Sequence, residues 1–386
     1  MTDRVQQQQP RPGIIELGFG EPDLTLLPTP IIEQCCRDAL ARHGRSMLAY
    51  GLNEGPAHLR RLIAERVTRR EGRGADLETL IVTGGNSHGF AHILDRFIDH
   101  DDVVFVEQPT YSLGLWIVRD RGVSMEPIDI DEDGLIVGLL EERLAAVRRD
   151  GRRPRLLYTV PTFHNPAGVS LAVERRRRLV ELAAAEDLLI VEDDAYRELW
   201  YDEPAPASLW SLAPAGTVLR LGSFSKVIAP GLRTGWLTAA REQVERYADC
   251  GLMESGGHVS WFSTFVTAQF LAEGLFDDHV AMLRSVYAER RDALCAALQR
   301  ELPAGCRFVR PAGGFFIRVV LPRGVSATRL LPVAESHGVA FVPGTRNQLA
   351  GGDDSLRLGF TLYEPAELRE GAARLAAAVE QAAARR

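Results

Sequence analysis

The alternation of apolar and polar segments from about residue 55 predicts an α/β fold. Stretches with apolar residues at helical spacing alternate with short, nearly continuous apolar strands. Helices are expected over residues 56–72, 87–100 and 171–186, and strands over 77–83, 102–107, 155–160, 188–193, 217–223 and 233–239. Short apolar strands separated by helices are typical of a mostly parallel sheet covered by helices on both faces.

The pattern changes near residue 277. One or two helices are expected over 276–301, a strand-like stretch over 307–321, a helix near 327–337, further short strands, and a terminal alanine-rich helix. This order predicts a smaller α+β domain. A chain of 386 residues also exceeds the size at which one hydrophobic core stops growing. We therefore expect residues 1–44 to join the small domain, 45–276 to form the large domain, and 277–386 to form the small C-terminal domain.

Composition and charge exclude several classes of protein. The formal net charge of −7 argues against binding to nucleic acid or to an anionic membrane, and the basic run at residues 174–178 is interpreted as a solvated helix face. Five scattered cysteines show no metal-ligand spacing and indicate reduced thiols. The same cysteine pattern argues against a zinc site. No apolar run reaches the roughly 18 residues that cross a bilayer. We therefore expect a cytoplasmic protein without a metal.

Polar or glycine residues follow several of the predicted strands. The stretch GGNS contains Gly85, Asn86 and Ser87, QPTY ends in Tyr111, and HNPAG begins one residue before Asn165. Parallel strands bring their carboxyl ends to the same edge of a sheet, where such folds bind ligands. These residues, with those of DDAY (193–196) and SFSK (223–226), are expected to converge at that edge.

Lys226 is the only lysine in the chain, and arginine supplies every other fixed positive side chain. Lysine and arginine are interchangeable as surface charges, but only a lysine amine can lose its proton and condense with a carbonyl. An accident on a surface loop is the alternative explanation. The neighbouring motifs favour a lysine that forms a Schiff base with pyridoxal 5′-phosphate (PLP), the versatile biological aldehyde cofactor.

The other demands of PLP are matched by the residues after the strands. Its phosphate needs amides, hydroxyls and a cation, which GGNS, Ser223, Ser225 and Arg233 supply. Its ring nitrogen needs a buried carboxylate, for which Asp193 is suited. Each motif has a plainer interpretation, since HNPAG and GGNS can be turns. The stretch around Asp193 and Asp194 can equally be a helix cap, a solvated pair or a metal site.

Three further residues are candidates to contact the phenolic oxygen and the ring of the cofactor. Asn165 and Tyr196 are candidates to bind its phenolic oxygen, and Tyr111 is a candidate to stack on its ring. The joint occurrence of these motifs, in an order that ends on the sole lysine, favours the PLP site over the separate turns and caps.

The sequence resembles the fold-type I PLP-dependent enzymes, and within them the class I/II aminotransferases. The matching stretches span nearly the whole chain: GFGEPD (18–23), YGLNEG (50–55), VEQPTY (106–111), HNPAG (164–168), EDDAY (192–196), SFSKVIAPGLRTGW (223–236) and LRLGFT (356–361). The resemblance implies that Lys226 carries the internal aldimine and acts as acid and base, so that an amino group moves between an α-amino acid and a 2-oxo acid.

Three roles come from the resemblance alone. Tyr50 matches a tyrosine that reaches the phosphate in the neighbouring subunit, which implies a homodimer with shared active sites. Arg357 matches the arginine that binds the substrate α-carboxylate, and Gly20 matches a glycine whose backbone lies against the substrate. Asn165 is expected to contact the substrate as well as the cofactor.

Some positions depart from the family pattern. His88 follows Asn86 and Ser87 where serine and glutamine are usual, and Arg318 stands where an aromatic or apolar residue is common. We expect His88 and Arg318 to lie on the surface. An inward Arg318 would instead favour an acidic substrate side chain. Arg346 and Asn347 replace an expected aromatic residue.

Other functions share parts of these motifs. A PLP enzyme for elimination, replacement or carbon–carbon bond formation in a specialised bacterial pathway uses the same cofactor residues. A transcription regulator with an aminotransferase-like domain needs a DNA-binding module, and only about fifty residues precede Tyr50. A dehydrogenase is not supported, since GFGEPD lacks the third glycine of a dinucleotide fingerprint.

Overall fold

The computed structural model describes residues 10–256 and 259–384. In this part of the chain the larger sheet has eight strands, five of which are consecutive and parallel. Their spatial order is β2 (Leu80–Thr83), β9 (Gly235–Thr238), β8 (Val218–Ser223), β7 (Leu189–Asp193), β6 (Arg153–Thr159), β3 (Asp102–Gln108), β4 (Ser124–Asp131) and β5 (Gly134–Leu135). The predicted mostly parallel α/β sheet is confirmed.

Strand β9 is antiparallel to both of its neighbours, β8 and β2. The chain leaves β8 at Ser223 and passes through Lys226 and the short helix η3 (Pro230–Leu232) before β9 begins. This connection is too short for a crossover helix, so the returning strand must run antiparallel. The lysine therefore lies in the turn between two paired strands.

Helices cover both faces of this sheet. Successive residues of each strand point to opposite sides, so the apolar side chains of one strand are buried on both faces. In β3, Val103 and Phe105 belong to one buried cluster, whereas Val104 and Val106 belong to the other. The helices of the large domain and the N-terminal segment are α1 (Thr29–His43), α2 (Ala57–Glu71), α3 (Asn86–Phe97), α4 (Ser112–Arg121), α5 (Val137–Arg149), α6 (Val173–Ala185), α7 (Leu209–Leu212), α8 (Arg241–Ala248), α9 (Gly251–Glu254) and α10 (Trp261–Ala272), with the short helices η1 (Leu24–Leu26) and η2 (Gly44–Leu48).

The C-terminal part forms a smaller antiparallel sheet with helices. Its strands are ordered β10 (Arg307–Phe308), β11 (Phe316–Val320), β14 (Ser355–Gly359) and β13 (Val342–Pro343), next to α12 (Ala327–Ser336), η4 (Gly344–Asn347) and α13 (Pro365–Ala384). A separate parallel pair joins β1 (Ile15–Glu16) to β12 (Val339–Ala340), so N-terminal residues lie against this domain.

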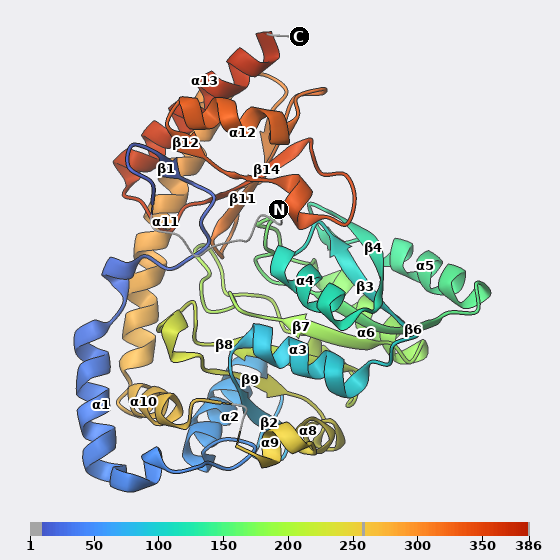
Figure 1. The fold of residues 1–386 in the computed structure, drawn as a ribbon, viewed down its shortest axis with the longest axis vertical. Coiled ribbons are helices and arrows are strands. Elements are labelled where there is room, and N and C mark those ends of the chain that lie inside the picture. Colours follow the sequence, from blue (N-terminus) through green and yellow to red (C-terminus); the bar gives the residue numbers. More distant parts are fainter. Residues whose placement is uncertain (1–9, 257–258, 385–386) are drawn as a thin grey trace.

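Helix α11 (Leu275–Glu301) is a single helix that runs from beside α10 to α13 (Figure 1). Near its start, Asp277 accepts a hydrogen bond from Arg66 of α2 at 2.8 Å. The division of the chain at residues 44 and 276 stays a prediction.

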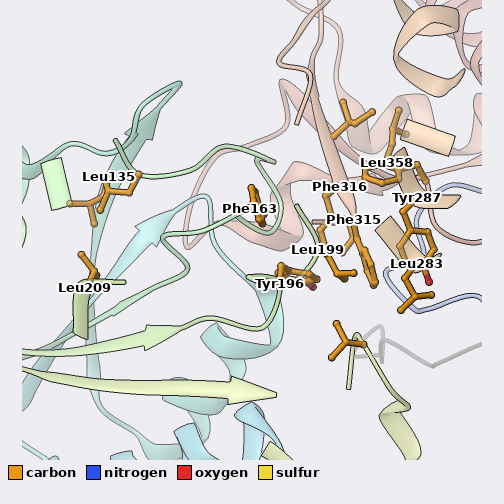
Figure 2. Packing of buried hydrophobic residues seen from close by; sticks show 14 of the residues in the cluster. Leu135, Phe163, Tyr196, Leu199, Leu209, Leu283, Tyr287, Phe315, Phe316 and Leu358 are labelled. Atoms are coloured by element: carbon orange, nitrogen blue, oxygen red, sulfur yellow. The ribbon is translucent and has the colours of Figure 1, made fainter. Parts of the chain in front are cut away.

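Aromatic side chains pack where the two domains meet. Figure 2 shows Tyr196, from the loop after β7, beside Phe315 and Phe316 of the small domain. The ring centroid of Tyr196 lies 5.3 Å from that of Phe315 and 6.0 Å from that of Phe316, both edge to face. This contact positions the two domains on either side of the candidate site.

Candidate active site

Lys226 lies at the junction of the two domains. Its Nζ donates a hydrogen bond to the carbonyl oxygen of Gly20 at 3.1 Å and lies 5.7 Å from the ring centroid of Phe315. Burial lowers the pKa of this amine to about 8, with the nearby charges of Arg357 and Arg233 opposed by those of Glu21 and Asp193. A large fraction of the amine is therefore neutral near pH 8, which nucleophilic attack on a carbonyl requires.

Asp193 is the last residue of β7 and is buried, and its charge opposes the lowering of the Lys226 pKa by burial. Its Oδ1 accepts a hydrogen bond from Asn86 Nδ2 at 2.6 Å, and its Oδ2 accepts one from the Tyr158 hydroxyl at 2.8 Å. Burial raises the pKa of the Asp193 carboxyl, while these two hydrogen bonds and the Lys226 charge oppose the rise. Asp193 is thus a buried carboxylate with donors on both oxygens.

The loop before α3 forms a cradle for an anion. Gly85 precedes the first helical residue, Asn86, with φ of 88°, a value that favours glycine. A Cβ at Gly85 would lie 2.7 Å from Nη2 of Arg233, so a side chain there would displace this guanidinium. Arg233 Nη2 also donates to the carbonyl oxygen of Gly84 at 2.7 Å. The amides of the helix start and this guanidinium together attract negative charge.

Ser223 and Ser225 lie on the neighbouring turn. Ser223 Oγ accepts a hydrogen bond from the backbone N–H of Ser225 at 3.0 Å. Ser87, by contrast, is exposed and shares a side-chain hydrogen bond with Tyr111, at the N-terminus of α4. Burial raises the pKa of the Tyr111 hydroxyl.

Arg357 of β14 reaches from the small domain to the large one. Its Nη1 donates to Asn165 Oδ1 at 3.1 Å and its Nη2 donates to the carbonyl oxygen of Gly18 at 2.7 Å, while its Nε is buried without a partner. Asn165 also shares a hydrogen bond with Tyr196, whose pKa burial raises well above its usual range. Burial lowers the pKa of Arg357 to about 10.

Gly20 lies beside the ring of Phe316. A Cβ at Gly20 would lie 2.5 Å from the Cζ of Phe316, and the guanidinium carbon of Arg357 lies 4.3 Å from the centroid of the same ring. Tyr50 is separate from this group, since 88% of its surface is exposed.

Three residues to which the sequence assigned no role lie near these groups. Tyr158, inside β6, is one, and the others are Thr110 and Asn347. The backbone N–H of Thr110 donates to the Asn347 carbonyl oxygen at 2.8 Å, and Asn347 Nδ2 donates to the Thr110 carbonyl oxygen at 3.0 Å. This pair joins η4 of the small domain to the loop before α4.

Asp194 faces away from the site into a buried ion-pair network. Its Oδ2 accepts hydrogen bonds from Nε of Arg220 at 2.9 Å and from Arg197. Despite burial, these two guanidinium groups lower the pKa of Asp194 to about 2. Among residues 10–256 and 259–384, no group of three or more histidine, cysteine, aspartate or glutamate side chains is placed to hold a metal.

The expected surface positions of His88 and Arg318 are wrong, because both side chains are half-buried. The ring of His88 stacks on that of His92, with centroids 6.3 Å apart, and its Nδ1 is buried without a partner. Arg318 pairs in register with Arg357 but lines a pocket of about 480 Å³ with Asp129, Asp353 and Asp354, among others. Lys226, Asn165 and Arg357 are not among the residues that line this pocket.

The residues present fit PLP. The cradle at Gly85 has the amides and cation that a phosphate needs, and a Cβ would fill it. Asp193 offers a buried carboxylate, and Asn86 Oδ1 and Arg357 Nε are buried polar atoms without protein partners. Lys226 supplies the amine, and the charges of Asp193 and Arg357 both influence its pKa.

Comparison with known proteins agrees with this geometry. The model of the family "Aminotransferase class I and II" matches residues 12–375, so the chain belongs to that family. It is 34% identical to an aromatic-amino-acid aminotransferase of Thermococcus litoralis, over 95% of this chain and 88% of the relative.

Two solved structures are similar throughout. A multiple substrate aminotransferase from Thermococcus profundus has a TM-score of 0.92 at 31% identity, covering 97% of this chain and 93% of its own. An α-aminoadipate aminotransferase from Thermus thermophilus, complexed with N-(5′-phosphopyridoxyl)-L-leucine, has a TM-score of 0.88 at 32% identity, covering 97% and 94%.

The protein is therefore a PLP-dependent aminotransferase, which moves an amino group between an α-amino acid and a 2-oxo acid. The predicted family, fold, cofactor and reaction are confirmed. The alternative of elimination, replacement or carbon–carbon bond formation is not favoured. The structure also has no helix, among the residues it describes, that is long and apolar enough to span a membrane.

Proposed function

We propose that Lys226 is the catalytic amine of this aminotransferase and that Arg357 binds the substrate. The observation that carries the proposal is that Lys226 Nζ donates a hydrogen bond to the Gly20 carbonyl oxygen at the domain junction, while the charges of Asp193 and Arg357 both influence its pKa. Lys226 holds PLP through Nζ. The cofactor supplies an electron sink for the charge left when a substrate Cα–H bond breaks.

The roles of the protein groups follow from their positions. Asp193 holds a proton on the ring nitrogen, and Arg233, Ser223, Ser225 and the start of α3 bind the phosphate. Asn165 and Tyr196 bind the phenolic oxygen, and Tyr111 covers the ring. With a substrate bound, Lys226 Nζ would be the base that takes the proton from the substrate Cα and the acid that returns it.

Arg357 is suited to the substrate α-carboxylate. Two parallel N–H donors of a guanidinium match the two oxygens of a carboxylate. The Nε of Arg357 has no protein partner, and Nη1 contacts Asn165. Gly20 leaves space beside Phe316, where a side chain would collide. The contact between Arg357 and Asn165 supports binding of the carboxylate at the domain junction.

We also propose a homodimer in which Tyr50 reaches the phosphate of the partner subunit. The ring of Tyr50 lies against Gly256, and Asn53 Nδ2 donates to Glu254 Oε1 at 2.7 Å, so residues 44–55 pack beside α9. This region exposes several large apolar side chains: Leu48 (68%), Tyr50 (88%), Leu52 (60%) and Leu252 (49%). A second copy covering such a patch is the usual arrangement for symmetric enzymes.

A cytoplasmic location is part of the proposal. The five cysteines are unpaired in the structure. Thiols persist in this form in the reducing cytosol.

The assay that tests the function uses the PLP-loaded protein with a panel of amino acids and 2-oxoglutarate. We expect glutamate and the matching 2-oxo acid to form in equal amounts. Release of ammonia or of a new carbon skeleton without glutamate would contradict the assignment.

A further inference from the structure

Asp193 is held by two donors on two different elements. Asn86 begins α3 and donates to Oδ1, whereas Tyr158 lies inside β6 and donates to Oδ2. Each oxygen of the carboxylate thus receives a hydrogen bond on a separate side. A carboxylate fixed in this way has one orientation with respect to the strand that bears it.

The orientation of the Asn86 amide is settled by its surroundings. Its Nδ2 also lies 3.3 Å from the carbonyl oxygen of Leu221, so both of its neighbours accept hydrogen bonds. Only the NH₂ group satisfies two acceptors. The side chain of Asn86 is therefore directed to Asp193, and its backbone remains at the start of the phosphate cradle.

Tyr158 is equally constrained. Only 1% of its surface is exposed, and its ring stacks on Phe90 with centroids 4.3 Å apart and planes 23° from parallel. Gly114 allows this packing, since a Cβ there would lie 2.9 Å from Cε1 of Tyr158. A buried tyrosine hydroxyl needs a partner, and here that partner is Asp193.

The two donors favour the charged form of the Asp193 carboxyl group. Burial favours the neutral acid, whereas both hydrogen bonds favour the charged carboxylate. Only the charged form stabilises a proton on the ring nitrogen of PLP. Loss of either donor would move the balance toward the neutral acid.

We propose that Asn86 and Tyr158 are positioning residues that keep the Asp193 carboxylate charged and aimed at the cofactor, and thereby keep the ring nitrogen protonated. The inference rests on the role of Asp193 in the proposed function. Because Asn86 also follows Gly85, it links the phosphate cradle to the carboxylate at the other end of the cofactor.

The test measures the protonation of the ring nitrogen itself. The wild type and the variants Asn86→Ala, Tyr158→Phe and Asp193→Asn are loaded with PLP labelled with ¹⁵N in the ring, and the ¹⁵N chemical shift is followed against pH. Tyr158→Phe retains the ring that stacks on Phe90, so packing is preserved. A matched control is Tyr247→Phe, because Tyr247 is fully buried but its hydroxyl has no partner.

We expect the wild type and Tyr247→Phe to lose the ring proton at the same high pH. Asn86→Ala and Tyr158→Phe should each lose it at a pH lower by about one to two units, since each loses a hydrogen bond to a charged group. PLP affinity, measured by absorbance titration, should fall in the same variants.

Two results would overturn the inference in different ways. The inference alone would be overturned if Asn86→Ala and Tyr158→Phe both lose the ring proton at the wild-type pH while Asp193→Asn loses it at a lower pH. If Asp193→Asn also loses the ring proton at the wild-type pH, the proposed role of Asp193 would be overturned as well.

Discussion

Arg357 of the small domain donates a hydrogen bond from Nη1 to Oδ1 of Asn165, in the loop after β6 of the large domain, at 3.1 Å. The two residues that we expect to contact the substrate and the phenolic side of the cofactor are thus joined across the domain junction. If Arg357 binds the substrate carboxylate as we propose, that carboxylate would lie near Asn165.

Replacement of Arg357 by lysine should weaken binding of every amino acid substrate. Lysine keeps the positive charge but lacks the paired N–H donors. We expect kcat/KM to fall by about ten- to a hundredfold for amino donors and 2-oxo acids alike, mainly through KM. Steady-state kinetics test this, and an unchanged KM for all donors would place the carboxylate elsewhere.

Attachment of PLP to the cofactor-free protein should depend on pH through Lys226. The pKa of this amine is lowered to about 8 because burial disfavours its charged form. The neutral, reactive fraction therefore increases as pH rises through about 8 and then levels off. Stopped-flow absorbance after mixing with PLP should show the rate rise and plateau. A rate that keeps rising until the pH approaches about 10, near the ordinary pKa of lysine, would contradict the lowered pKa of Lys226.

The lowered pKa of Lys226 should also make the free energy of unfolding depend on pH. The pKa of Lys226 is lower in the folded than in the unfolded chain, so between about pH 8 and about pH 10 only the unfolded chain carries the proton. This group should therefore make the free energy of unfolding rise with pH in that window. A Lys226→Met variant should lack this contribution in denaturant titrations, and an identical pH slope in both proteins would be the contrary result.

Replacement of Arg318 by alanine should leave donor preference unchanged. Arg318 lines a pocket with Asp129, Asp353 and Asp354, whose charges oppose the entry of an acidic side chain. Ratios of kcat/KM for glutamate, leucine and phenylalanine should match the wild type. Selective loss of glutamate turnover would show that Arg318 reaches the substrate after all.

Hybrid dimers test the proposed role of Tyr50. One subunit carries Lys226→Ala and the other Tyr50→Phe. If Tyr50 completes the site of the partner, each hybrid has one site with both native residues and should regain wild-type PLP affinity at that site. If Tyr50 acts within its own chain, no hybrid site is complete and affinity stays low.

Much of the fold followed from the sequence because the strands are short, apolar and separated by clear helical spacing. The predicted helix over 56–72 corresponds to α2, and the strand over 102–107 to β3. Helix α4 was not predicted, since Gly114 interrupts it and its apolar residues do not form one stripe. Strand β4 was missed because Pro127 lies inside it and most of its residues are at least partly exposed.

The candidate site could be predicted where residue type is tied to chemistry, as for Lys226 and Asp193. For Tyr158 the sequence holds one signal, a tyrosine that follows two leucines in a strand, whose hydroxyl needs a partner if it is buried. The partner depends on how β6 lies beside β7, which spacing does not specify. Asn347 was noted only as a departure, and its contact with Thr110 depends on how the two domains meet.

The most direct test of the central claim is the covalent attachment of PLP to Lys226. The PLP-loaded protein is reduced with borohydride, digested and analysed by mass spectrometry, with Lys226→Arg as the control. Because Lys226 is the only lysine, an adduct on a lysine side chain has a single possible position. We predict a phosphopyridoxyl adduct on the peptide that contains Lys226 and none on the matching peptide of the variant. An unmodified Lys226 peptide from PLP-saturated protein would contradict the account.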